Sequence, residues 1–251
     1  MQNRSRRIFL KKAALGSAAA IGIPQIVSAA MNNGSVKKIP LKQNDIILFQ
    51  GDSIPDSSRK RDDSEPNSPS ALGRGYPYIA ASELLLKHPG KNLRIYNKGI
   101  SGNKVFQLAE RWDDDCLSLK PNVLSILIGV NDFWHTLVNN YAGTVKTYKD
   151  DLTTLLDKTK QQLPDVQLVL GEPFAVNGIR SVDDKWFPAF RGYQDAARET
   201  ASRYNALFIP YQKVFDEAQK RAPGVYWTYD GVHPSLAGAS LMAQAWMEVI
   251  E

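Results

Sequence analysis

The sequence predicts an α/β domain built on a parallel sheet with helices on both of its faces. Short, continuous apolar stretches alternate along the chain with longer stretches in which apolar residues recur at helical spacing. Residues 46–50 and 123–128 are apolar at nearly every position, which is typical of strands buried on both faces. Strands and helices that alternate in this way fold as a parallel sheet covered by helices on both sides.

Taken in order, the strands are expected at 46–50, 93–97, 123–128, 166–170 and 206–209. The apolar spacing predicts helices over 76–88, 105–117, 144–162, 188–204, 211–222 and 235–249. Two long stretches, 54–75 and 174–187, are expected to be surface loops. The chain shows no internal repeat and no second domain, so residues 45–251 are assigned to one domain.

The first thirty residues have a different character from the rest. Ser5-Arg6-Arg7-Ile8-Phe9 carries a twin arginine, the run 13–26 is small and apolar, and Val27-Ser28-Ala29 offers an A-x-A-like cleavage site. Residues 1–30 therefore resemble a bacterial twin-arginine (Tat) signal peptide, which predicts export to the periplasm or the medium. The alternative is an uncleaved anchor or a basic tail. Residues 31–44 are expected to form a polar linker.

The charge of the chain is concentrated in that leading segment. The full sequence has 31 basic and 26 acidic residues, and five of the basic ones but no acid lie in residues 1–30, so the remainder is formally neutral. We therefore expect no nucleic-acid partner, and no stable membrane insertion once the signal is cleaved. A single cysteine, Cys116, excludes an intramolecular disulfide, and the three histidines have no spacing typical of zinc ligation.

Four expected turns carry polar groups suited to acyl transfer: Ser53, Gly102, Asn131, and Asp230 with His233. Strand-end turns of a parallel sheet converge on one edge, so these groups are expected to meet there. A serine hydroxyl needs a base, which His233 can be, and Asp230 three residues earlier can orient the imidazole. The backbone N–H groups of Ser53 and Gly102 and the Asn131 amide can stabilise the oxyanion of a tetrahedral intermediate.

These segments resemble the sequence blocks of the SGNH hydrolases, also called the GDSL esterase/lipase superfamily, over residues 46–250. The matching segments are Gly51-Asp52-Ser53, Gly99-Ile100-Ser101-Gly102-Asn103, Gly129-Val130-Asn131-Asp132 and Asp230-Gly231-Val232-His233-Pro234. The resemblance implies a three-layer α/β/α sandwich with a flavodoxin-like central sheet of about five parallel strands. It also implies Ser53 as nucleophile, His233 as base and Asp230 as its orienting acid, with Ser53, Gly102 and Asn131 forming the oxyanion hole. One departure is Pro55, where the family commonly has threonine.

We therefore expect an exported serine esterase that hydrolyses carboxylic esters and needs neither a metal nor an organic cofactor. The expected substrates are O-acetyl groups on carbohydrate, because the family includes carbohydrate acetylesterases and export suits glycan degradation. Trp134, His135 and Glu172 are candidate substrate contacts, whereas Trp186 and Trp227 suit sugar stacking or packing. One alternative is a lysophospholipase or thioesterase acting on longer acyl chains. Another is a catalytically inactive glycan-binding module on the same fold.

Overall fold

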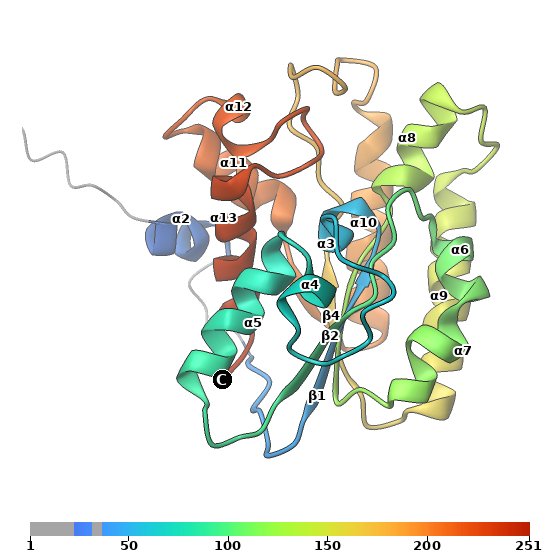
Figure 1. The fold of residues 1–251 in the computed structure, drawn as a ribbon. Helices are drawn as coiled ribbons and strands as arrows, with labels where there is room; N and C mark the ends of the chain where they lie inside the picture. Colours follow the sequence, from blue (N-terminus) through green and yellow to red (C-terminus); the bar gives the residue numbers. More distant parts are fainter. Residues whose placement is uncertain (1–22, 32–36) are drawn as a thin grey trace, which may run out of the picture.

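The strands form a single parallel sheet in the computed structural model, which describes residues 23–31 and 37–251 (Figure 1). The strand order is β2-β1-β3-β4-β5, and every neighbouring pair is parallel. The strands are β1 (Ile46–Gly51), β2 (Arg94–Asn97), β3 (Val123–Leu127), β4 (Gln167–Gly171) and β5 (Leu207–Ile209). This order confirms the expected flavodoxin-like sheet.

Helices lie on both sides of the sheet, as the three-layer prediction requires (Figure 1). In one group α2, α5, α11 and α13 pack together, and in the other α9 packs against α6 and α10. The longer helices are α2 (Ile23–Ala30), α5 (Tyr76–Lys87), α6 (Val105–Glu110), α8 (Val130–Val138), α9 (Val145–Gln162), α10 (Ala189–Arg203), α11 (Tyr211–Gln219) and α13 (Leu236–Met247). Shorter turns are α3 (Ser53–Asp56), α4 (Pro69–Leu72), α7 (Trp112–Asp115), η1 (Leu117–Leu119) and α12 (Gly224–Trp227).

The core lies where the central strands meet these helices. Every residue of β3 is buried, which explains why its sequence is apolar without alternation. From one side Trp246 of α13 packs on Phe49 of β1, with ring centroids 4.9 Å apart, and its indole N–H donates to Ser125 Oγ at 3.0 Å. From the other side the Tyr148 hydroxyl of α9 donates to the carbonyl of Ile128 at 3.1 Å. Both helices are thereby fixed to the sheet near its carboxyl edge.

The order in which successive strands are added to the sheet reverses at β1, because β2 lies on one side of this strand and β3 on the other. Open α/β sheets bind their ligands at such a switch point, outside the carboxyl ends of the strands. The ends of three strands are level there, since Gly51 is in register with Leu127 and Leu127 with Gly171. The turns that carry Ser53, Asn131 and Glu172 therefore leave the sheet at the same edge.

One predicted helix, 105–117, is broken into α6, α7 and η1. The break is at Arg111, whose backbone lies at φ −114° and ψ 10°. Its guanidinium donates to Lys98 O at 2.8 Å, to Asp115 Oδ2 at 2.7 Å and to Asn103 Oδ1 at 3.0 Å. The side chain thus ties the helical segment to the turn after β2, and this tertiary contact overrides the local helical pattern.

The arginine pair of the expected export signal lies outside the described residues. The expected cleavage site of that signal, 27–29, falls within α2, where Ile26, Val27 and Ala30 are buried. The second half of the expected linker is packed rather than free: Ile39 is buried and forms a parallel bridge with Ile250. Across residues 23–31 and 37–251, none of the helices has the length and apolar character needed to cross a bilayer.

Candidate active site

The position of Ser53 follows from the way β1 ends. Gly51 has φ +146°, and a Cβ atom there would lie 1.9 Å from the carbonyl oxygen of Leu127, so the close approach of β1 to β3 requires glycine. Asp52 then caps α3, with its Oδ1 accepting from the backbone N–H of Ile54 at 3.0 Å. Ser53 is the first residue of α3, directly above the carboxyl edge of the sheet.

Pro55, the departure from the family pattern, also lies in the first turn of α3. Backbone N–H groups in a first helical turn have no intrahelical partner, so the missing donor costs no hydrogen bond. The carbonyl of Pro55 accepts from Asn97 Nδ2 at 2.6 Å, which anchors α3 to the end of β2. The geometry after the nucleophile is therefore maintained.

Ser53, His233 and Asp230 form a continuous hydrogen-bonded chain. Ser53 Oγ lies 2.8 Å from His233 Nε2, and His233 Nδ1 lies 2.8 Å from Asp230 Oδ2. The second carboxylate oxygen, Asp230 Oδ1, accepts from the backbone N–H groups of Val232 at 2.9 Å and His233 at 2.8 Å. Since one imidazole nitrogen faces the carboxylate and the other faces the hydroxyl, the arrangement suits proton transfer from Ser53 to His233.

The electrostatics of the pair agree with this arrangement. The hydrogen bond that His233 donates to Asp230 raises the pKa of His233 above its usual 6.5, against the opposing effect of burial. Burial alone would raise the pKa of Asp230, but the hydrogen bonds from the imidazole and from two backbone N–H groups lower it to about 2. Asp230 is therefore ionised across the neutral range, and the imidazole is a stronger base than a free histidine.

The segment 174–187, expected to be a long surface loop, is hydrogen-bonded to the loop that carries Asp230 and His233. The Val176 N–H donates to Gly231 O at 2.7 Å, and the Ser181 N–H donates to Asp230 O at 3.0 Å. Gly231 has φ +94°, and a Cβ there would lie 2.8 Å from Val176 O. Trp186, near the end of this segment, is buried, and its indole N–H donates to Ser181 O at 2.9 Å, so its role is packing.

The expected oxyanion donors come from the turns after β2 and β3. Gly102 adopts φ +83°, which lets the turn after β2 fold back over the sheet edge. Asn131 is buried in the first turn of α8, and its Nδ2 donates to Asn103 O at 3.1 Å. This bond joins the two turns and uses one amide hydrogen, which leaves the other for an oxyanion.

Replacing Asn131 with alanine is expected to lower kcat for p-nitrophenyl acetate by about 10²- to 10³-fold, because one preorganised donor to the oxyanion is lost. Asn139→Ala, at the exposed end of the same helix, is the matched control and is expected to keep full activity. Initial rates measured with folded protein test this, and a loss below threefold for Asn131→Ala would exclude the amide from the oxyanion hole.

Comparison with known proteins agrees with this geometry. Residues 49–241 match the model of the GDSL-like lipase/acylhydrolase family. The chain belongs to this family. Among curated proteins, this GDSL chain is 34% identical over 208 residues to an acetylxylan esterase of Geobacillus stearothermophilus, covering 81% of this chain and 93% of that protein.

Solved structures of GDSL proteins are similar over the same region. A GDSL-like protein of Parabacteroides merdae ATCC 43184 is 50% identical with a TM-score of 0.83, covering 84% of this chain and 98% of the other. The G. stearothermophilus acetylxylan esterase is 32% identical with a TM-score of 0.75, covering 84% and 96%. Catalytic mutants of that esterase replace a serine, an aspartate or a histidine, and its aspartate and histidine are three positions apart. This GDSL chain is a carboxylic ester hydrolase.

Of the three candidate substrate contacts in this GDSL protein, Trp134 lies beside His233. Its ring centroid is 6.2 Å from that of His233 and 5.8 Å from that of Trp186. His135 turns toward Lys104 instead, with Nδ1 3.2 Å from Lys104 Nζ. Burial and this cation lower the pKa of His135, so the imidazole is neutral near pH 7.

Glu172 has a structural position. Its carboxylate is buried, with Oε1 accepting from Arg198 at 2.8 Å and Oε2 accepting from the backbone N–H of Gln212 at 3.1 Å. It therefore links α10 to the start of α11, and the geometry does not support the expected contact with substrate. Trp227 is likewise buried, and its indole N–H donates to Ala218 O at 3.1 Å.

The burial of two acids near Ser53 was not anticipated from the sequence. Burial raises the pKa of Asp52 and of Asp132 to about 7, and in each carboxyl the Oδ2 atom has no hydrogen-bond partner. Both groups are thus partly protonated near neutral pH, and any charge on Asp52 adds to the basicity of His233. Motif spacing identifies these aspartates, but only packing shows that they are desolvated.

Proposed function

We propose that this GDSL enzyme removes O-acetyl groups from carbohydrate through an acetyl-enzyme intermediate on Ser53. The observation that carries the proposal is the connected chain from Asp230 through His233 to Ser53, with both links at 2.8 Å. Such a chain activates a hydroxyl for attack on an ester carbonyl. The family assignment and this intact chain also argue against the alternative of a non-catalytic glycan-binding module.

Each step of the mechanism uses groups of this chain. His233 Nε2 takes the proton of Ser53 Oγ as the oxygen attacks the acetyl carbonyl, and the tetrahedral oxyanion receives hydrogen bonds from the turns that carry Gly102 and Asn131. The C–O bond to the sugar then breaks, and the imidazolium returns its proton to the leaving oxygen. Water attacks the acetyl-enzyme by the same route and releases acetate.

The choice of a carbohydrate acetyl ester is supported by a relative. The G. stearothermophilus protein is named an acetylxylan esterase, and mutants of it are described as acetyl-xylooligosaccharide esterases. At 34% identity over 81% of this chain, a shared substrate class is a reasonable extension of a shared family.

A screen for released acetate tests the proposal. The purified protein is incubated with acetylated xylan, other acetylated polysaccharides and p-nitrophenyl esters from acetyl to dodecanoyl. We expect release of acetate from at least one glycan and a rate that falls steeply as the acyl chain lengthens. Faster hydrolysis of long acyl esters, with no acetate released from any glycan, would favour the lysophospholipase or thioesterase alternative.

We also propose that the protein is exported through the Tat pathway and acts in the periplasm or outside the cell. The proposal is based on Arg6 and Arg7, the apolar run after them and the small residues at 27–29. Cell fractionation followed by N-terminal sequencing tests it, and we expect periplasmic protein that begins just after residue 29. Protein found only in the cytoplasm, with its first residue intact, would contradict the proposal.

A further inference from the structure

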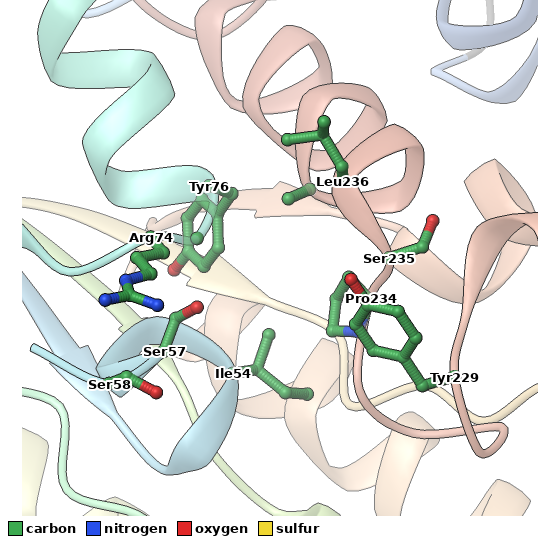
Figure 2. Close-up of a pocket in the computed structure, with 11 residues that line it drawn as sticks. Ile54, Ser57, Ser58, Arg74, Tyr76, Tyr229, Pro234, Ser235 and Leu236 are labelled. Atoms are coloured by element: carbon green, nitrogen blue, oxygen red, sulfur yellow. The ribbon is translucent and has the colours of Figure 1, made fainter.

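A cavity of about 290 Å³ lies between α3 and the beginnings of α5 and α13 (Figure 2). Two residues of its wall directly follow the reacting ones: Ile54 follows Ser53, and Pro234 follows His233. A third wall residue, Tyr229, belongs to the same loop as His233, and its backbone N–H donates to His233 O at 2.9 Å. The cavity is thus built from the segments that hold the nucleophile and the base.

This location is on the leaving-group side of the reaction. The imidazolium of His233 must give its proton to the oxygen of the departing alcohol, so the alcohol has to lie against the loop that holds this histidine. Tyr229 and Pro234 of that loop form one wall of the cavity (Figure 2). The cavity is therefore placed to receive the alcohol, whereas Trp134 is placed near His233 from α8.

The wall combines an aromatic face with hydrogen-bonding groups. The side chain of Tyr229 is 61% exposed, and Ser57, Ser58 and Arg74 lie across the cavity from it (Figure 2). Two hydroxyls and a guanidinium supply both donors and acceptors, and no acidic side chain lines the cavity. A sugar ring matches this surface, because it has apolar C–H faces that pack on an aromatic ring and a rim of hydroxyls that hydrogen-bond.

The two serines are held in a rare conformation. Ser57 and Ser58 have φ +38° and +60°, a left-handed geometry that residues other than glycine seldom adopt. Both follow α3 directly, and the N–H of Ser57 donates to Ser53 O at 2.9 Å. Ser57 is the C-cap of α3, in the left-handed geometry that commonly ends helices.

The size and surroundings of the cavity favour one ring over a long acyl chain. Small-molecule pockets are commonly about 300–1,000 Å³, so this one is at the small end. Its wall includes two exposed apolar residues, Tyr229 and Leu236, rather than the enclosed apolar channel that a long acyl chain would need.

We propose that this cavity is the subsite for the sugar ring that carries the acetyl group, with Tyr229 as the ring's stacking platform and Ser57, Ser58 and Arg74 as its polar contacts. The inference depends on the proposed function, since it assigns a place to the carbohydrate part of that substrate. Tyr229 is then a specificity-determining residue: it contacts the alcohol and not the acetyl carbonyl.

Paired kinetics of Tyr229→Ala test the assignment. The quantity measured is kcat/KM for acetylated xylooligosaccharide divided by kcat/KM for p-nitrophenyl acetate, which has no sugar ring. We expect this ratio to fall at least tenfold, chiefly through a higher KM for the oligosaccharide, and Tyr229→Phe to keep it within threefold because the ring is retained. Tyr226→Ala, at a 56% exposed tyrosine that does not line the cavity, is the matched control and is expected to leave the ratio unchanged.

The outcomes separate this inference from the proposed function. If the wild-type enzyme releases acetate from the oligosaccharide and Tyr229→Ala keeps the ratio, or Tyr226→Ala lowers it equally, the subsite assignment is wrong and the acetylesterase function stands. If the wild-type enzyme hydrolyses p-nitrophenyl acetate but no acetylated glycan, the proposed substrate is wrong and the subsite is rejected with it.

Discussion

Ser53→Ala is expected to lower kcat for p-nitrophenyl acetate by about 10⁶-fold, because the acyl-accepting oxygen is removed and the remaining groups only bind the ester. Ser53 Oγ is the only atom of that side chain that reaches His233, and the distance between them is 2.8 Å. The measurement is initial rate at saturating ester, with mass spectrometry of the intact protein to check that no acetyl-enzyme forms.

The control for this variant is its stability. Ser53 is only partly buried and is not the cap of α3, which is Asp52, so we expect the thermal midpoint to stay within a few degrees of wild type. Thr144→Ala, which removes a hydroxyl from the cap of α9, is the reverse control: it is expected to lower stability and retain most of the activity. Full residual hydrolysis in Ser53→Ala would remove Ser53 from the mechanism.

Asp230→Asn is expected to lower kcat by about 10⁴-fold and to shift the pH profile. With His233 as the base, its neutral imidazole is the active form, so kcat/KM is expected to fall as the pH drops through its pKa, which the hydrogen bond to Asp230 raises above 6.5. Without the carboxylate charge, burial lowers that pKa, and the acid limb of the profile should move to lower pH. A profile of kcat/KM between pH 4 and 9 measures this.

A matched control separates the effect of losing the Asp230 carboxylate from the effect of losing a carboxylate elsewhere in the protein. Asp216 on α11 also accepts a side-chain hydrogen bond, from Gln212 at 3.0 Å, and lies outside the catalytic chain. Asp216→Asn is expected to keep both kcat and the position of the acid limb. An acid limb that stays in place in Asp230→Asn would show that this carboxylate does not set the pKa of His233.

The strands, their parallel direction and the meeting of Ser53, His233 and Asp230 were predictable from the sequence for local reasons. Continuous apolar runs such as 123–128 can only be strands buried on both faces or parts of buried helices, and their lengths and flanking glycines favour strands. Because parallel strands end at a common edge, the turns carrying Ser53 and Asn131 could be placed together before any coordinates were known. The three-residue spacing of Asp230 and His233 could likewise be read from neighbouring positions in the sequence.

The remaining features depend on contacts between segments far apart in the chain. The helix break at Arg111, the burial of Glu172 against Arg198, and the bracing of the Asp230 loop by 174–187 have no signature in local sequence. The same holds for the desolvated carboxyls of Asp52 and Asp132, since burial is a property of the whole packed domain.

The sequence by itself determined which chemistry this protein carries, because motif identity and strand-end placement are encoded within a few residues of each other. Only the tertiary structure decided which polar residues lie at the candidate site and which hold the fold together. That difference has a physical cause: a carboxylate or a ring acquires its role from the atoms that desolvate it or donate to it, and those atoms come from distant parts of the chain.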